Sequence, residues 1–418
     1  MLRSLKLVGV GPAPEMEMHF APRLNVLTGD NGLGKSLFLE TIWYVLTRNW
    51  VGMPAWPRRN ADPAKIEFSI YTDEITRFLF QRPTQKWENG GGISYGDYIV
   101  LYARVDGSVA IHDPTRIDKR GPSSPEDLIF LPQEILNGQK DGERYICRGL
   151  IEDWVTWQER KSDTSSGMAF ARLLSILEDL SPNPNALIPD ETEVIRPGKP
   201  VRLFVNDPRE FPTINVGYGD TPIIHASAAM LRIISLAYLM TWAWREHVEA
   251  SRLLNRDPLK RIIFLMDEVE NHLHPEWQRR ILPALLKVLE SLGEGMQVQM
   301  HVTTHSPMVL ASLEPHWDEK RDELFHFALK DRKVVLESSE LGRWGTASRW
   351  LKSRVFGLHA DRSVEAERAM EDANAFMRGD EPQFFKTPEE VDVELKRTLP
   401  GQDPFWPRWL IFMGDAEK

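Results

Sequence analysis

The chain has 418 residues, of which 42% are hydrophobic and 27% charged, a composition that excludes a disordered or fibrous protein and is typical of a soluble globular one. A formal net charge of −10 argues against a protein that coats nucleic acid through a uniformly basic surface, although a local basic groove is compatible with it. The single cysteine, Cys147, excludes an internal disulfide and a cysteine-cluster zinc site, and it favours a reducing, cytoplasmic setting.

The first third of the chain is predicted to contain mainly strands, with one helix after a glycine-rich stretch. Leu2–Val8 and Leu24–Leu27 have strand patterns, and the second runs directly into the glycine-rich stretch TGDNGLGKS. LFLETIWYVL follows with the apolar spacing of a helix, and the amino terminus lacks the features of a secretory signal. Between Lys65 and Asp113, the stretches KIEFSIY, YIVLYARV and SVAIHD, separated by ENGGG, predict a small antiparallel sheet.

The middle of the chain is helical and the following part alternates between helices and strands. Helical patterns from Leu150 to Leu180 end at the proline-rich SPNPNALIP and predict an inserted lobe. The apolar run Leu231–Trp244 is predicted to be a buried helix, because it is too short for a bilayer and Arg232 interrupts it; we expect no membrane association. The next elements are expected to be the strand RIIFLMDE, the helix EWQRRILPALLKVLESL, the strand VQMHVTTHSP and the hairpin LFHFALKDRKVVLES. This alternation predicts an α/β fold with a buried parallel sheet.

The glycine-rich stretch GDNGLGKS, Gly29–Ser36, fits the pattern G-x-x-x-x-G-K-[ST] and lies between a strand and a helix, as a phosphate-binding loop requires. Its backbone N–H groups would surround the β- and γ-phosphates of ATP at a helix N-terminus. Lys35 would neutralise phosphate charge, and the Ser36 hydroxyl would complete the shell of Mg²⁺. The residues predicted to contact ATP in this loop are Asp30, Asn31, Gly32, Leu33, Gly34, Lys35 and Ser36. A plain glycine-rich turn is the alternative.

Two further motifs end predicted strands. In IIFLMDE, Asp267 would hold Mg²⁺, directly or through water, and Glu268 would orient the attacking water. Their structural alternative is to cap the next helix. In THSP, His305 would emerge at the same sheet edge and sense the γ-phosphate. A lone histidine is usually structural, but the order and spacing of the motifs favour a functional one.

A weaker signal is FLPQEIL, which places Gln133 at a predicted strand-to-helix junction. This glutamine could reach both Mg²⁺ and the attacking water. The alternative is a surface glutamine in a turn.

Together with NHLHP at Asn271–Pro275, these motifs resemble the ATPase heads of the ABC, SMC and RecF superfamily, closest to the stand-alone ATPases grouped with the OLD and Septu proteins of bacteria. The resemblance implies an ABC-type P-loop ATPase head with a mixed central sheet, an antiparallel β subdomain and an inserted helical lobe. It implies that Asn271 begins a D-loop at a dimer interface and contacts nucleotide, that Gln133 is the Q-loop residue and that His305 is the switch histidine. The expected divisions are 1–140 and 226–340 for the head, 141–225 for the lobe and 341–418 for a helical extension.

The superfamily also has a signature motif, LSGGQ in transporters, which opens a helix upstream of the acidic strand. ASAAM, Ala226–Met230, occupies that place, and by this resemblance Ser227 would contact the ATP of the partner in a head-to-tail dimer. Both glycines are replaced by alanine and the glutamine by methionine, which leaves the close approach of the backbone open. A plain N-cap serine with small neighbours is the alternative.

The resemblance implies an ATPase that dimerises around two ATP molecules and acts as the sensor or motor of a bacterial anti-phage defence system. Similar ATPases pair with a small HNH-type nuclease, and the segment from Arg343, including DPFWPRW, is the predicted docking element, with burial of its tryptophans against the head as the alternative. No intrinsic nuclease is expected, because the chain lacks the acidic cluster of a TOPRIM domain and an HNH-like histidine arrangement; His272 and His274 lie in the D-loop and His301 in a core strand.

Two other functions fit the same motifs. One is a RecF-like DNA-repair ATPase that binds duplex DNA, for which a basic patch could serve, unless that patch is only a solvated helix face. The residues of that patch are Arg343, Arg349, Lys352 and Arg354. The other is an ATP-gated scaffold with little turnover.

Overall fold

The computed structural model describes residues 1–416 apart from 60, 62, 90–95, 117–127, 183–193, 216–218 and 359–360. Most of the expected glycine cluster ENGGG and of the proline-rich linker SPNPNALIP therefore lies outside the described residues. The chain forms two compact units, Met1–Gly345 and Thr346–Lys418.

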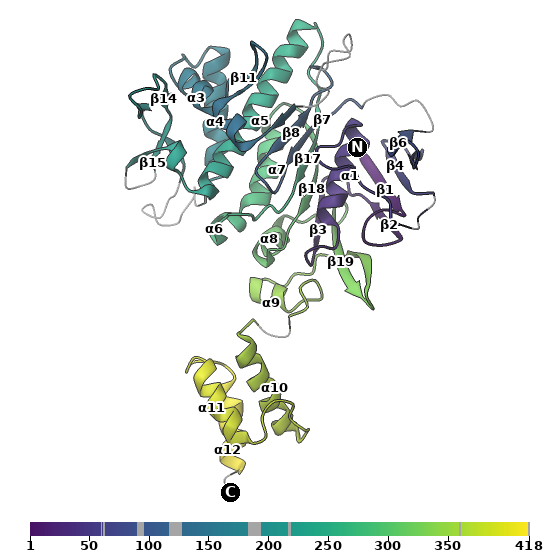
Figure 1. The fold of residues 1–418 in the computed structure, drawn as a ribbon. Coiled ribbons are helices and arrows are strands. Elements are labelled where there is room, and N and C mark those ends of the chain that lie inside the picture. Colours follow the sequence, from purple (N-terminus) through teal and green to yellow (C-terminus); the bar gives the residue numbers. More distant parts are fainter. Residues whose placement is uncertain are drawn as a thin grey trace. The chain divides into compact units, whose positions relative to one another are not determined.

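The first unit is built on a mixed eight-stranded sheet with the order β20-β19-β3-β18-β17-β7-β8-β9 (Figure 1). The five inner strands, from β19 to β7, are parallel, and β20, β8 and β9 extend the two edges in antiparallel pairing. In sheet order, the strands span Lys333–Ser339, Asp322–Lys330, Leu24–Gly29, Gln297–Thr303, Arg261–Met266, Ile99–Ala103, Val109–His112 and Leu128–Phe130. Burial on both faces accounts for the continuous apolar run of β17, and every residue of β3 is buried as well.

The register of the parallel strands sets the position of the motifs. Met266 of β17 pairs with Val302 of β18 and with Ala103 of β7, while Thr303 pairs with Leu27 of β3. The carboxyl ends of β3, β17 and β18 therefore meet at one edge, and the loops that leave them are neighbours.

A second sheet is antiparallel throughout, with the order β2-β1-β4-β5-β6. Its strands, in that order, span Glu15–His19, Leu2–Val8, Lys65–Ile70, Thr76–Gln81 and Lys86–Asn89. Helix α1, Lys35–Thr47, lies between the two sheets, and Phe38, Ile42 and Trp43 are fully buried in the core that joins them (Figure 1).

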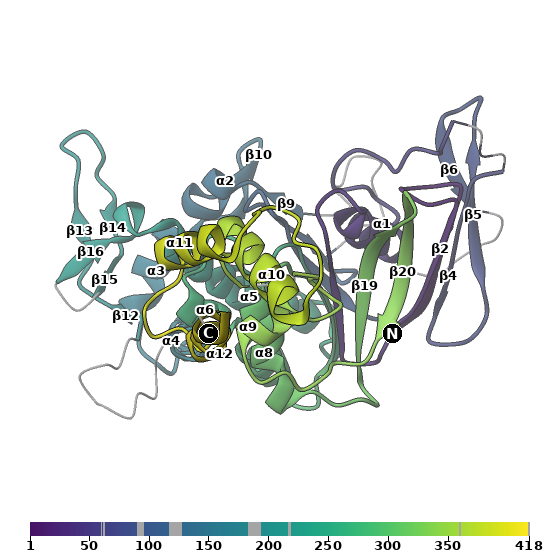
Figure 2. The same ribbon diagram turned by 90° about the horizontal axis from the view of Figure 1, so that it is seen from below.

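Helices cover the central sheet on its other side. The long helix α5, Ala228–Leu253, packs against α4, Ser165–Asp179, and α3, Leu150–Gln158, packs on α4. Tyr238 of α5 anchors this lobe, since its hydroxyl donates to Asp153 Oδ2 at 2.7 Å. Around the lobe lie α2, Pro132–Asn137, the 3₁₀ turn Ile223–His225, and seven short strands (Figure 2). These strands, β10 to β16, are Gln139–Asp141, Arg144–Cys147, Arg196–Pro197, Val201–Arg202, Glu210–Phe211, Thr213–Asn215 and Asp220–Pro222.

Three further helices connect the carboxyl-terminal strands of the first unit. They are α6, Pro275–Gln278, α7, Ile281–Ser291, and α8, Pro307–Leu313, and a 3₁₀ turn at Glu314–His316 follows α8. Ser306 caps α8 by accepting the N–H groups of Met308 and Val309.

The described residues of the second unit form four helices. They are α9, Ala347–Leu351, α10, Val364–Arg378, α11, Pro388–Thr398, and α12, Trp406–Ala416. Alanines at one face of α10 allow α11 and α12 to pack closely, with Trp409 fully buried and its indole N–H donating to Asp392 Oδ1 at 3.0 Å. Asp372 of α10 ties the loop before α11 by accepting three consecutive N–H groups, from Gln383 to Phe385.

Three expectations need correction. YIVLYARV and SVAIHD form β7 and β8 of the central sheet, not part of the antiparallel sheet that KIEFSIY joins. The predicted single helix of EWQRRILPALLKVLESL is broken between Gln278 and Ile281 into α6 and α7. Trp409, expected at an interface or against the head, is in the core of the second unit.

Candidate functional site

The phosphate loop leaves β3 at Gly29 and enters α1 at Lys35, as expected. Gly29, Gly32 and Gly34 have φ angles of 126°, 76° and 101°, in the region that side chains other than glycine rarely adopt. At Gly29 space is also closed, because a Cβ there would lie 2.1 Å from the carbonyl oxygen of Phe327 on β19. The first turn of α1 then presents N–H groups that no residue of the helix can accept, which suits an anion.

The Lys35 side chain folds back over this loop. Its ammonium group donates to the carbonyl oxygens of Gly29, at 2.8 Å, and Asp30, at 2.7 Å. Burial lowers the pKa of Lys35 to about 8, against the opposing effect of the carboxylates of Asp267 and Glu268. A phosphate bound beside the ammonium group would favour its charged form and so raise the pKa of Lys35 again.

Asp267 and Glu268 follow β17 directly and differ in surroundings. Asp267 is buried and accepts the Thr303 hydroxyl at Oδ1, 2.6 Å away. The same Thr303 oxygen accepts the N–H of Glu268 at 2.7 Å. Glu268 has a φ of 45°, unusual for a residue with a side chain, and no described residue forms a hydrogen bond to its carboxylate. One acid is therefore fixed and the other is free to contact a ligand.

His305 follows β18 and is oriented by Glu270. The Glu270 carboxylate accepts the N–H of His305 and, at 2.8 Å, the hydroxyl of Thr304. Burial lowers the pKa of His305 below its ordinary value, and the positive charge of Lys35 adds to this effect. A neutral imidazole at neutral pH can donate one hydrogen bond to a phosphate oxygen without bringing a second charge.

These groups surround one cavity of about 230 Å³. Its lining consists of Asn31, Gly32, Gly34, Lys35, Ser36, Leu37, Asp267, Glu268 and His305. Ser36 and Asp267 offer a hydroxyl and a carboxylate oxygen, the ligand types that suit Mg²⁺ together with phosphate oxygens. Asp30 and Leu33 are not in the lining, and the Leu33 side chain is buried in the core.

The structure places the other predicted residues outside this cavity. Gln133 lies exposed in the first turn of α2 and lines a separate cavity of about 310 Å³. Asn271 donates from Nδ2 to the carbonyl of Val105 at 3.1 Å. Ser227 is exposed and caps α5, with its hydroxyl oxygen accepting the N–H of Met230 at 3.3 Å. The capping role expected for the serine is present, and its role toward a partner stays a prediction.

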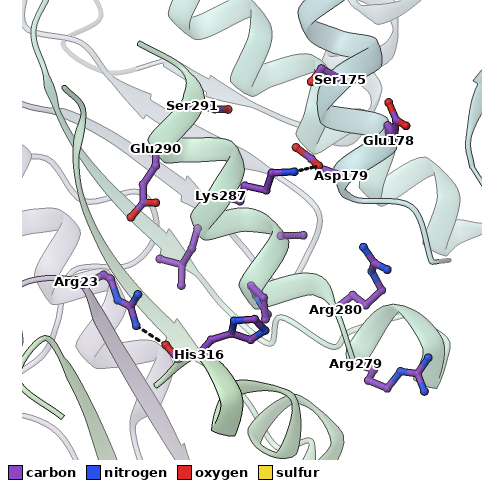
Figure 3. A pocket seen from close by; sticks show the side chains of 13 residues that line it. Arg23, Ser175, Glu178, Asp179, Arg279, Arg280, Lys287, Glu290, Ser291 and His316 are labelled. Carbon is purple, nitrogen blue, oxygen red and sulfur yellow. Dashed lines mark hydrogen bonds and ion pairs between the residues drawn. The ribbon is translucent and has the colours of Figure 1, made fainter. Parts of the chain in front are cut away.

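A larger cavity, about 920 Å³, is at a different place (Figure 3). It lies between α4 and α7 and already contains its own polar partners: Lys287 pairs with Asp179 at 2.6 Å, and Arg23 donates to the carbonyl of His316 at 2.7 Å. None of its lining residues belongs to the phosphate loop or to the acidic pair. Volume alone would therefore point to the wrong site.

Three residues that contact the motifs were missed in the sequence. Thr303 and Glu270 lie directly beside the motifs, but nothing in one sequence marks a threonine or a second glutamate as a partner. Arg232 was treated only as an interruption of an apolar run, although its Nη2 donates to the carbonyls of Asp267, at 3.2 Å, and Glu268, at 3.1 Å.

No helix in the part of the chain that the structure describes has the length and hydropathy needed to cross a membrane. No three His, Cys, Asp or Glu side chains of the described segments are grouped to hold a metal ion by themselves. His301, expected in a core strand, is fully buried there, with its ring 4.7 Å from that of Phe20.

Comparison with known proteins points to one group. A family model described as "AAA domain, putative AbiEii toxin, Type IV TA system" matches residues 158–311. The chain is 20% identical over 427 residues to the Septu protein PtuA of Bacillus thuringiensis, which covers 96% of this chain and 95% of that protein. It is 42% identical over 52 residues to the Retron Ec83 probable ATPase of Escherichia coli, a match that spans 12% of this chain and only 8% of that protein.

Among solved structures, the SMC head domain from Thermotoga maritima aligns with 81% of this chain and 99% of its own, at 14% identity and a TM-score of 0.40. The recombination mediator protein RecF aligns with 80% of this chain and 98% of its own, at 13% identity and a TM-score of 0.36. At these scores the two structures add nothing to the sheet order described above. The phosphate-loop motif, the family match and the two relatives show that the chain is related to ATPases, among them the Septu and retron ATPases.

Proposed function

We propose that this chain binds ATP with Mg²⁺, hydrolyses it to ADP and phosphate, and acts as the ATPase subunit of a bacterial anti-phage defence system. The observation that carries the proposal is the single cavity shared by the phosphate loop, Asp267, Glu268 and His305. The relation to a Septu protein over nearly its whole length supports the defence role.

Each residue of the cavity has a separate proposed role. The phosphate loop and Lys35 bind the β- and γ-phosphates, and Ser36 and Asp267 hold Mg²⁺, which when bound neutralises charge on the phosphate oxygens. Glu268 accepts a hydrogen bond from the attacking water and aligns it with the γ-phosphorus. His305 donates to a γ-phosphate oxygen and registers its loss.

Replacing Glu268 with glutamine tests the hydrolytic role. We expect turnover to fall by about 100-fold or more, since a positioned base contributes roughly 10²–10⁴ in rate, while ATP remains bound. The matched control is Glu294→Gln, at an exposed position in the loop before β18. Equal turnover in the wild type and the Glu268→Gln variant would support an ATP-gated scaffold instead.

We further propose that two chains dimerise head to tail around ATP, with Ser227 contacting the nucleotide of the partner. The exposure of Ser227 and Ala228 supports this, whereas the methyl group of Ala229 points into the core. In a Glu268→Gln background, Ser227→Arg should abolish the ATP-dependent dimer in sedimentation. Ser363→Arg, which removes another exposed N-cap serine, should leave the dimer intact.

A partner nuclease of the HNH type completes the proposed system, with the second unit as its docking element. Purification of the tagged chain from its native operon should recover the nuclease in stoichiometric amount. Recovery of the chain alone would contradict this part. The basic patch proposed for a DNA-repair role is weaker than its sequence suggests, because Lys352 is paired with Asp361 at 2.8 Å.

A further inference from the structure

Arg232 connects the start of helix α5 to the backbone of the acidic pair. It lies five residues after Ser227, about 7.5 Å along the helix axis. Its guanidinium donates from Nη2 to the carbonyl oxygens of both Asp267 and Glu268. These are contacts between groups 35 and 36 residues apart in the chain.

The surroundings make this contact unusual for an arginine. The carboxylates of Asp267, Glu268 and Glu270 are close enough to counter the burial that lowers the pKa of Arg232, yet no ion pair joins it to a described residue. Its Nη1 is buried and has no hydrogen-bond partner among the described residues. The hydrogen bonds of Arg232 therefore go to the backbone of the acidic pair and not to a carboxylate.

Glu268 needs the support that Arg232 provides. Its φ of 45° is a conformation that costs a residue with a side chain free energy, and such strain persists only where neighbours fix it. The N–H of Glu268 is held by Thr303, and its carbonyl oxygen is held by Arg232 and by the N–H of Asn271 at 2.9 Å. Arg232 is the only one of these three that comes from the helix that Ser227 begins.

We propose that Arg232 is a positioning residue that orients Glu268 for hydrolysis and connects it to Ser227 of the same chain. The inference rests on the proposed ATPase function. When Ser227 engages the nucleotide of a partner, the first turns of α5 adjust, and Arg232 carries that adjustment to the backbone of Glu268. Each chain would then hydrolyse its own ATP only when its signature loop is occupied.

The cavity of about 310 Å³ leaves space for this movement. Arg232 lines it together with Gln133, Ser235 and His272, and so does Met266 at the end of β17. Its side chain is thus packed on one side against the acidic pair and faces open volume on the other. The Arg232 side chain can therefore change the hydrogen bonds of Nη2 by rotating into this open volume.

The test compares Arg232→Gln and Arg232→Lys with the wild type. For Arg232→Gln we expect kcat to fall at least tenfold, with the KM for ATP, the affinity for a non-hydrolysable ATP analogue and the melting temperature nearly unchanged. Lysine should restore part of kcat, because it can reach one carbonyl but cannot span both. Arg252→Gln, at the exposed end of the same helix, is the matched control and should behave as the wild type.

The connection to Ser227 requires a double-mutant cycle. If Arg232 transmits the state of the signature loop, Ser227→Ala combined with Arg232→Gln should lower kcat by less than the product of the two single effects. If the two substitutions lower kcat independently, the connection to Ser227 is wrong. The positioning role is wrong if Arg232→Gln keeps the wild-type kcat, or if it loses kcat, nucleotide affinity and melting temperature together. Wild-type turnover no greater than that of Lys35→Ala would instead overturn the proposed ATPase function.

Discussion

The hydroxyl of Thr303 joins the two acidic residues, because it donates to Asp267 Oδ1 at 2.6 Å while its oxygen accepts the N–H of Glu268 at 2.7 Å. The threonine is at the end of β18 and the acids are at the end of β17, so one side chain fixes the spacing between two strands. Its position makes it the first residue to test outside the motifs.

Thr303→Val should disturb both acids while keeping the shape of the side chain. It leaves a buried carboxylate and an N–H group without their partner, which should cost about 1–3 kcal/mol of stability. We also expect a higher Mg²⁺ concentration for half-maximal ATPase activity. Thr303→Ser, which keeps the hydroxyl, is the control; equal Mg²⁺ dependence in valine and serine variants would contradict the assignment.

The affinity for ATP should depend on pH through Lys35. Its pKa of about 8 means that the ammonium loses its proton as pH rises through that value, so binding of a non-hydrolysable ATP analogue should weaken between pH 7 and 9.5, by up to tenfold per pH unit above 8. A bound phosphate favours the charged form of Lys35, so nucleotide binding should take up protons in this pH range. Lys35→Met should bind weakly and lose this part of the pH dependence; a wild-type affinity that stays constant across the range would be the contrary result.

Gly29→Ala should prevent correct formation of the phosphate loop. The added Cβ meets the Phe327 carbonyl and the φ of 126° is strained for alanine, so we expect a stability loss above about 2 kcal/mol and no nucleotide binding. At Gly32 no atom lies within 4 Å of a new Cβ, and only the strain of a φ of 76° remains. Thermal melting of both variants should therefore show the larger loss for Gly29→Ala.

Asp153 should make stability fall as pH rises. Burial raises its pKa to about 6 from 3.8, against the hydrogen bond from Tyr238, so the folded chain binds this proton more tightly than the unfolded chain. The contribution is fully present below about pH 4 and lost as pH rises to about 6. Asp153→Asn should gain on the order of 2 kcal/mol relative to wild type between pH 4 and 7.5. Exposed Asp163→Asn in the same lobe should not.

The local motifs of this protein could be predicted from sequence, whereas their partners could not. Gly29–Ser36 is specified within eight residues, and Asp267–Glu268 ends a strand whose apolar run is visible by itself. By contrast, Arg232 meets the acidic pair across 35 residues, and its direction depends on where α5 packs. No single-sequence pattern contains that information.

The sequence also could not show to which of the two sheets a predicted strand belongs. YIVLYARV has the composition of a strand in either sheet, and only its parallel pairing with β17, more than 150 residues later, places it in the centre. The break between α6 and α7 was also not visible, since Trp277, Ile281 and Leu285 keep helical spacing across it.

The burial of α1 between two sheets has a consequence for motion. Amide hydrogens of this helix should exchange with solvent only on global unfolding, because no smaller opening exposes it. The phosphate loop is therefore attached to a helix that is buried between two sheets. We expect nucleotide-driven rearrangement in α5 and in the loops after β17 and β18 instead. Hydrogen exchange should therefore be slow in α1, and faster and sensitive to ATP at the start of α5.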